Sequence, residues 1–171
     1  MTLPDMKTTT PQRPQRQDRR IQERVHDTYK LRGKLTEPTR CPQCAAVYHN
    51  GRWIWSASAP QQANEQLCSA CHRINDNYPA GEVTLSGSFV KSHEDEIIRL
   101  ARNIEATEKD EHPMNRIISV RDQEDGLLIT TTDVHLPQRI AKAIRNAWSG
   151  ELDIHFDNAG YFTSIVWHRD D

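Results

Sequence analysis

The 171-residue sequence contains four cysteines, and they occur as two Cys-x-x-Cys pairs. Cys41 and Cys44 enclose Pro-Gln, Cys68 and Cys71 enclose Ser-Ala, and twenty-three residues separate the pairs. Two residues between cysteines let a tight turn direct both sulfurs to one point, and two such turns complete a tetrahedral sulfur site for zinc. The spacer slightly exceeds the usual length, which still fits a ribbon with a longer loop. We therefore predict that these four cysteines bind one structural Zn²⁺.

Other uses of the cysteines are open alternatives. Disulfides need an oxidising compartment, and the N-terminal residues lack the apolar stretch of a secretory signal. A thioredoxin-like redox motif needs one Cys-x-x-Cys pair that opens a helix, whereas both pairs lie in turn-rich sequence. His49 and His72 lie near the two turns and are alternative ligands. Four thiolates would fill the coordination shell, which favours a structural ion over a catalytic one.

Charge is distributed unevenly along the chain. Residues 1–40 contain ten Lys and Arg and five Asp and Glu, a net charge of +5. Residues 41–91 are neutral, and residues 92–171 carry nine Lys and Arg against sixteen Asp and Glu, a net charge of −7. A basic segment joined to an acidic one suggests a polyanionic partner for the basic part.

The composition divides the chain into three segments. Residues 1–35 are predicted to be a basic, largely disordered arm, because the first eighteen residues are rich in Pro, Gln, Thr and Arg and offer almost nothing to bury. A short basic helix is possible from Arg19 to Lys34, ending at Gly33. Residues 36–91 are predicted to be a zinc-ribbon module without a long helix. Its expected strands are Ala46–His49, Arg52–Ser56 and Glu82–Val90.

Residues 92–171 are predicted to form an α+β domain with the order α-β-β-α-β-β. The first helix begins after Ser92, which resembles a capping box with Asp95, and ends at His112-Pro113. The second has Asp133 as its cap. The simplest packing places both helices on one face of a four-stranded antiparallel sheet. The strands and the second helix are expected at 116–121, 127–132, 134–148, 152–156 and 161–168, with an Asp125-Gly126 turn between the first two strands.

Cationic and aromatic residues of the first two segments are candidates for RNA contacts. Guanidinium groups on a flexible chain suit phosphates, and indoles can stack on bases. A solvated tail is the alternative interpretation of the arm. Packing over a small core is the favoured role for at least one of the two tryptophans near Arg52. The RNA-binding candidates are Arg13, Arg16, Arg19, Arg20, Arg24, Lys30, Arg32, Lys34, Arg40, Arg52, Trp53 and Trp55.

The C-terminal domain offers a different kind of surface. Its acidic sheet lacks the aromatic pair of an RNA-reading sheet and suits a protein partner better than phosphate. Asp133 and His135 are favoured as a helix cap and a first-turn residue over an acid–base pair. The polar outer face of the sheet is expected to include Arg116, Thr130, Thr132, Asp153, His155 and His168.

Several classes of protein are disfavoured by the sequence. It contains no nucleophile beside a base, no phosphate-cradling glycine loop and no second metal cluster, so we expect neither an enzyme nor a small-molecule substrate. The sequence contains no run of 18 apolar residues, which a membrane-spanning helix would need, and no secretory signal is evident. We therefore expect a cytoplasmic protein.

Four stretches of the sequence resemble a family of uncharacterised bacterial zinc-ribbon proteins. They are CPQCAAVYHNGRWIW, CSACHRINDNYPAGEVTLSGSF, EIIRLARNIEATEKDEHPMNRI and ITTTDVHLPQRIAKAI, and the resemblance extends from about Arg19 to Arg169. That family is in turn similar to the archaeal and eukaryotic nuclear-export adaptor of the large ribosomal subunit, through the paired cysteine turns and the following α/β segment.

The resemblance implies that all four cysteines are metal ligands, and Ala45 stands where such ribbons commonly have glycine. It also implies an association with ribosomes or ribosomal RNA. Our hypothesis is therefore a zinc-binding protein that associates with RNA, with ribosomes or ribosomal RNA as the first candidates. The alternative is a protein–protein adaptor that acts through the acidic C-terminal domain.

Overall fold

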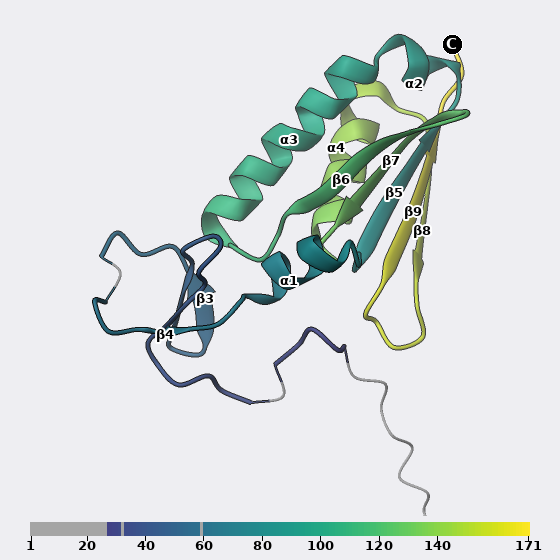
Figure 1. Cartoon of the computed structure of the whole chain (residues 1–171). Helices are drawn as coiled ribbons and strands as arrows, with labels where there is room; N and C mark the ends of the chain where they lie inside the picture. The colour runs from purple at the N-terminus through teal and green to yellow at the C-terminus, as the bar shows by residue number, and fades with distance from the viewer. Residues whose placement is uncertain (1–26, 32, 59) are drawn as a thin grey trace, which may run out of the picture.

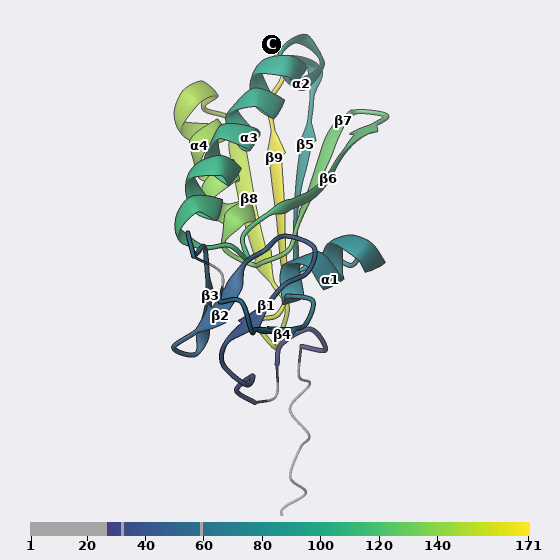
Figure 2. The same cartoon turned by 60° about the vertical axis from the view of Figure 1, so that its left-hand side comes forward.

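The computed structural model describes residues 27–31, 33–58 and 60–171, and these residues form two β-sheets and four helices (Figure 1). The α+β fold class predicted from the sequence is confirmed. The larger sheet and its helices form one body, and the smaller sheet lies beyond one end of the larger sheet (Figures 1 and 2). Across the described part of the chain, no helix combines the length and the hydropathy that crossing a lipid bilayer requires.

The larger sheet has five strands in the order β6-β7-β5-β9-β8. Neighbouring strands of this sheet are antiparallel except for β5 and β9, which are parallel. The pairing of β5 with β9 runs from Gly81 opposite Thr163 to Ser86 opposite His168. The prediction of a four-stranded antiparallel sheet is therefore wrong, because β5 inserts between the two predicted hairpins. The strands are β5 (Gly81–Ser86), β6 (Ile117–Gln123), β7 (Gly126–Thr131), β8 (Glu151–Phe156) and β9 (Thr163–His168).

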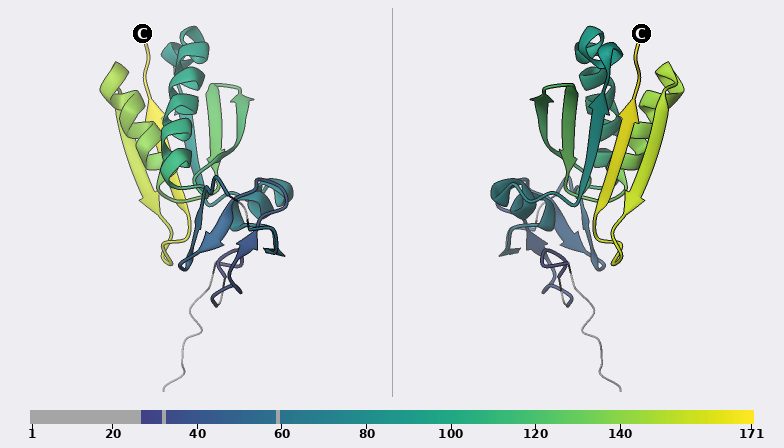
Figure 3. Two further views of the ribbon diagram at one scale, coloured as in Figure 1. Left: turned by 90° about the vertical axis from the view of Figure 1, so that its left-hand side faces the viewer. Right: turned by 90° about the vertical axis from the view of Figure 1, so that its right-hand side faces the viewer.

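Three helices cover one face of this sheet, α2 (Ser88–Ser92), α3 (Glu94–Glu111) and α4 (Leu136–Trp148) (Figure 3). The apolar stripe of α3 buries Ile97 and Ala101, which are four residues apart and therefore lie on one face of the helix. The core they share with the strands is the main hydrophobic cluster of the described chain, and its largest buried side chains are Trp167, Leu85, Ile97, Leu127, Ile129, Leu136, Ile140, Ile144 and Ile165.

The ends of these helices show which local signals held. The Asp133 carboxylate accepts hydrogen bonds from the backbone N–H groups of His135 at 2.7 Å and Leu136 at 3.1 Å, so it does satisfy the first N–H of α4. The predicted position of the cap is wrong by two residues, because α4 begins at Leu136 and its N-cap is His135, which makes no side-chain cap bond. The predicted capping box of Ser92 and Asp95 does not form, because α3 begins after His93 without a side-chain cap. The Ser92 hydroxyl instead donates to Ser88 O inside α2.

The expected strand Glu82–Val90 ends early, at Ser86, because the chain turns sharply at Gly87. Gly87 has φ +105°, and a Cβ there would lie 2.1 Å from the carbonyl oxygen of Arg169. Only glycine fits this backbone position. The residues after it form α2, so the second half of the predicted strand is helical.

The smaller sheet has the order β3-β2-β1-β4, with β1 and β4 parallel. It leads into α1 (Ser69–Asp76), a helix that the sequence analysis did not predict. The described residues before this sheet form turns and bends without a helix; the rest of the basic helix predicted for 19–34 lies outside the described residues. The strands are β1 (Thr39–Arg40), β2 (Val47–His49), β3 (Arg52–Ile54) and β4 (Asn64–Glu65).

Candidate metal centre

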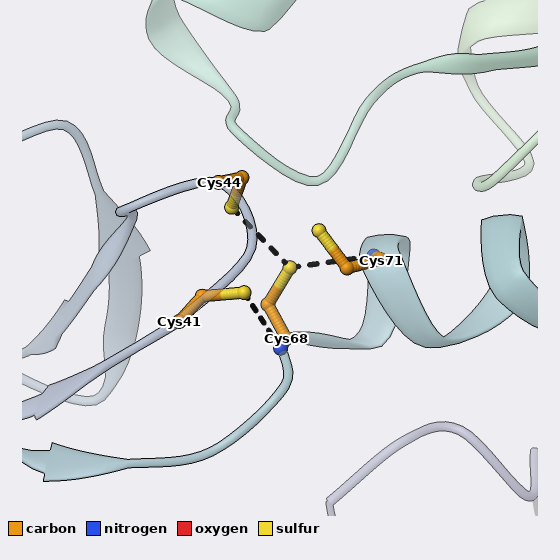
Figure 4. Close-up of side chains that lie close together, drawn as sticks. All are labelled: Cys41, Cys44, Cys68 and Cys71. Carbon is orange, nitrogen blue, oxygen red and sulfur yellow. Dashed lines mark hydrogen bonds between the residues drawn. The ribbon is translucent and has the colours of Figure 1, made fainter.

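The four cysteines converge on one point between the smaller sheet and α1 (Figure 4). Their sulfur atoms all lie within 4.8 Å of one another, and the sulfurs of Cys44 and Cys68 are 3.7 Å apart. Four thiolates at about 2.3 Å from a central ion would lie about 3.8 Å apart, so the observed spacing is that of a tetrahedral metal site with little adjustment. No disulfide links these cysteines. The site could hold a metal ion, as the sequence predicts.

The first pair is shaped by the turn that connects β1 to β2. Ala45 N donates to Cys41 O at 2.9 Å, and Cys41 N donates to Ala46 O at 2.8 Å, which folds the chain back on itself. Ala45 has φ +64°, in the left-handed region that glycine adopts most easily. The position that the sequence analysis noted for its missing glycine is therefore the one that requires this conformation.

The second pair opens α1, and Cys68 is its N-cap. The Cys68 sulfur accepts a hydrogen bond from Cys71 N at 3.4 Å, and Cys68 N in turn donates to the Cys41 sulfur at 3.4 Å. Such N–H···S bonds orient the thiolates and connect the two turns. A signal for the end of α1 was present in the sequence, because Asn77 caps it in the left-handed conformation and Pro79 follows.

The charge state of the thiols reflects their burial together. Burial raises the pKa of the Cys68 and Cys71 thiols. Burial also raises the pKa of the Cys41 thiol, but the N–H groups of Cys68, Cys44 and Gln43 outweigh it and lower the pKa to about 7. Several thiolates in one buried place repel one another, and a bound cation removes that repulsion.

Arg116 completes the site, and the sequence analysis did not find it. Its guanidinium donates to the sulfurs of Cys44 at 3.1 Å and Cys71 at 3.2 Å, and its side chain is buried. It enters from the segment between α3 and β6, which passes beside the cluster in Figure 4. Arg116 was expected on the outer face of the sheet, so that expectation is wrong.

The backbone and neighbouring side chains fix the position of Arg116. Its Nε donates to Pro113 O at 2.7 Å, and its backbone N donates to the Thr132 hydroxyl at 2.9 Å. Burial lowers the pKa of the guanidinium, but its hydrogen bonds to Cys44 and Cys71 raise the pKa by more than burial lowers it. Arg116 therefore keeps its positive charge. A divalent ion with four thiolates carries a net charge of −2, and the Arg116 cation offsets half of it.

Two tryptophans border the centre. Trp53 packs against the cysteine cluster with Leu67 and Met114, which confirms that at least one indole has a packing role. Trp55 is 36% exposed, and its indole N–H donates to Lys109 O at the end of α3. The two indoles therefore attach the smaller sheet to the cysteine cluster and to the helical layer.

The histidines near the turns lie outside the four-sulfur group. His49 contacts Glu37 at 3.5 Å, and His72 contacts Asp76 at 3.9 Å. Neither belongs to the group of potential ligands around the cysteines.

The RNA-binding candidates fall into three sets. Lys30, Lys34 and Arg52 are exposed, and the Arg40 guanidinium is partly neutralised by Glu65 at 3.0 Å. Trp53 and Trp55 have the packing contacts given above. The remaining candidates, Arg13, Arg16, Arg19, Arg20, Arg24 and Arg32, lie outside the described residues.

The outer face of the larger sheet is less polar than expected. Thr130 and Thr132 are buried, so neither is available to a partner. Asp153 and His155 are exposed and 2.9 Å apart, and His168 lies between Ser86 and Asp170.

No protein-family model matches the chain, and no curated protein matches it. The resemblance to the bacterial zinc ribbons therefore stays a prediction.

Proposed function

We propose that the metal ion is zinc and that its role is structural. Tetrahedral sites made of four sulfurs suit zinc or iron, and zinc is the usual ion where two short turns close the site. The four sulfurs leave no coordination position for water or substrate. The small cysteine cluster contains few apolar residues, so the ion would supply much of the folding free energy of this region.

We further propose that the protein binds RNA, and ribosomal RNA is the first candidate. One observation carries this proposal: Lys30, near the end of the basic segment, and Arg52, on the metal-bearing sheet, line the same pocket beside Trp53. Both cations therefore lie next to the metal centre, because Trp53 also packs against the cysteine cluster. Cations gathered around an indole suit phosphates and bases together.

The charge of the chain gives the proposed complex a direction. Residues 92–171 carry a net charge of −7, so the five-stranded sheet and its helices should repel phosphates. RNA would then contact the cysteine-bearing region and the basic segment, with the larger sheet turned away. Proteins that bind RNA on an open sheet with aromatic residues instead place the RNA on the sheet itself.

The experiment is sedimentation of the zinc-loaded protein with ribosomes, together with binding to ribosomal RNA fragments at 50 and 200 mM salt. The difference in affinity between the two salt concentrations measures the electrostatic part of the binding. The triple variant Lys30→Ala, Lys34→Ala, Arg52→Ala should bind at least 10-fold more weakly and with a smaller salt dependence. A matched variant with the same change of charge replaces the exposed helix residues Arg99, Lys142 and Arg145 by alanine. Equal affinities of the two triple variants would contradict the proposed surface, and no binding at low salt would contradict the function.

A second candidate function is that of a protein–protein adaptor. It is favoured by strand β8, an edge strand of the larger sheet, where Phe156 is 58% exposed next to the exposed acidic residues Asp153 and Asp157. Edge strands and exposed aromatic rings are common protein-binding features. Recovery of partners with the full-length protein after nuclease treatment, and their loss in Phe156→Ser, would favour the adaptor over the RNA-binding protein.

A further inference from the structure

A pocket of ≈ 570 Å³ lies where four parts of the chain meet. Tyr29, Lys30, Leu31 and Gly33 form one side, the β2–β3 hairpin forms another, and the end of α3 with the segment that leads to β6 forms the third. Ser69 of α1 is the fourth contribution. The volume of the pocket falls in the range of pockets that enclose a small organic group. None of the four cysteines lines the pocket, although Trp53 and Met114 contribute both to its lining and to the cysteine cluster.

Aromatic rings form the pocket wall on the hairpin. Tyr48 and Trp53 are opposite one another on β2 and β3, and their ring centroids are 5.5 Å apart at an angle of 67°. Ile54 and Met114 add apolar surface. Tyr48 is buried and Trp53 is partly exposed, so Trp53 is the ring of this pair on which a flat ligand could stack.

The charge of the lining is positive on balance. Lys30 and Arg52 are exposed cations of the lining, and Glu111 is its one carboxylate. Within residues 27–31, 33–58 and 60–171, neither cation has an ion-pair partner. Cations at a pocket with aromatic walls favour a ligand that is flat and bears a phosphate.

We propose that this pocket takes up one unstacked base of single-stranded RNA. The inference rests on the proposed function and specifies how that function recognises its ligand. Trp53 would supply the stacking surface, and Asn115 and Ser69 would face the polar edges of the base. Lys30 and Arg52 would contact the adjoining phosphates. The preferred ligand is then a single strand or loop, because a base paired in a duplex is not free to enter.

The first test compares three RNA ligands of equal length on the full-length, zinc-loaded protein. They are a single strand of ten nucleotides, the same strand with one central base removed, and a duplex. The abasic strand keeps every phosphate, so electrostatic binding is unchanged. We expect the single strand to bind most tightly, and the loss of one stacked base to weaken binding by about 10-fold.

The second test fills the pocket. Asn115→Trp places a bulky ring in the lining at a partly buried position, and Asn103→Trp places the same ring at an exposed position on α3. Asn115→Trp should bind the intact strand no better than the abasic strand, whereas Asn103→Trp should bind both like the wild type. Zinc content and circular dichroism verify that both variants are folded. Photo-crosslinks from 4-thiouridine in the strand provide a readout without substitution, and they should map to Tyr48, Trp53 or Met114.

The outcomes separate the two proposals. If the intact and abasic strands bind equally and crosslinks fall outside the pocket, the base-binding pocket is wrong while RNA binding stands. If none of the three RNA ligands binds at low salt, both are wrong. A preference for the intact strand that Asn115→Trp abolishes would support both.

Discussion

The Arg116 guanidinium donates a hydrogen bond to the sulfur of Cys71 at 3.2 Å, although 45 positions separate the two residues in the sequence. Cys71 belongs to α1, whereas Arg116 immediately precedes β6 of the five-stranded sheet. The contact therefore connects the metal centre to the larger folded body. Charged donors next to metal ligands orient them and adjust the affinity for the ion.

Arg116→Gln should weaken metal binding by about 10- to 100-fold, because glutamine can donate to a sulfur but cannot offset its charge. Arg116→Lys keeps the positive charge on a single donor group, so its metal affinity should lie between those of the wild type and Arg116→Gln. Competition with a chromophoric chelator measures the affinity. Arg99→Gln, at an exposed position of α3, is the control for loss of one cation. Equal affinities of wild type and Arg116→Gln would show that the sulfurs need no countercharge.

Ala45→Gly should stabilise the metal-loaded protein by about 1 kcal/mol, because Ala45 has φ +64° and glycine adopts this conformation without steric cost. The exposed position of Ala45 means that little packing is lost. Urea denaturation measures the free energy of unfolding. Ala106→Gly, at an exposed position within α3, should have the opposite effect and destabilise the protein by about 0.5–1 kcal/mol.

Removal of the metal should unfold the cysteine-bearing region and leave the five-stranded sheet folded. The two parts have separate hydrophobic clusters, and the cluster under α3 and α4 contains no cysteine. Hydrogen exchange after treatment with a strong chelator measures this, through loss of protection in residues 39–76 and retention in β5, β7 and β9. Simultaneous loss of protection in both parts would mean that they unfold as one cooperative unit.

Asp170→Asn should destabilise the five-stranded sheet and its helices at pH 7. The Ser88 N–H donates to Asp170 Oδ1 at 3.0 Å and, together with His168, lowers the pKa of the carboxyl below its ordinary 3.8. A lowered pKa means that the carboxylate contributes stability above pH 3.8 and loses that contribution as the pH falls through the native pKa. The difference between variant and wild type should therefore shrink in acid.

The amide exchange of Ser88 at several pH values reports this difference directly. Asp122→Asn is a matched control, because Asp122 is an exposed residue of β6 with no hydrogen bond or ion pair of its side chain in the described part of the chain. A constant difference across the range would show that the Asp170 carboxylate is not the group that titrates.

Local signals predicted much of the fold. The helices α3 and α4 follow from apolar stripes bounded by Pro113 and by Asp133, and the order α-β-β-α-β-β is confirmed. These features depend on residues close together in the sequence. The gathering of the four cysteine sulfurs at one site was likewise predictable, because the spacing within each pair limits the geometry of its turn.

Long-range features were not predictable in the same way. The pattern of β5 identifies a strand but not its neighbour, and its partner β9 lies about 80 residues later. The side of the sheet that Arg116 faces could not be read from alternation, because the register of β6 shifts between Ile117 and Ser119. The second cysteine turn also has a contact that its local sequence does not indicate, the bond from the Cys68 N–H to the Cys41 sulfur, 27 positions away.

The central place of β5 has a consequence for synthesis of the protein on the ribosome. The four cysteines and β5 are translated before β9, so β5 stays without its parallel neighbour until β9 has been made, roughly 100 residues after Cys71 and thus on the order of 5–20 s later. During that interval the nascent chain can acquire its ion while the sheet is still incomplete. Metal loading would then precede closure of the main core, and Arg116 would join the preformed sulfur cluster as the sheet assembles around it.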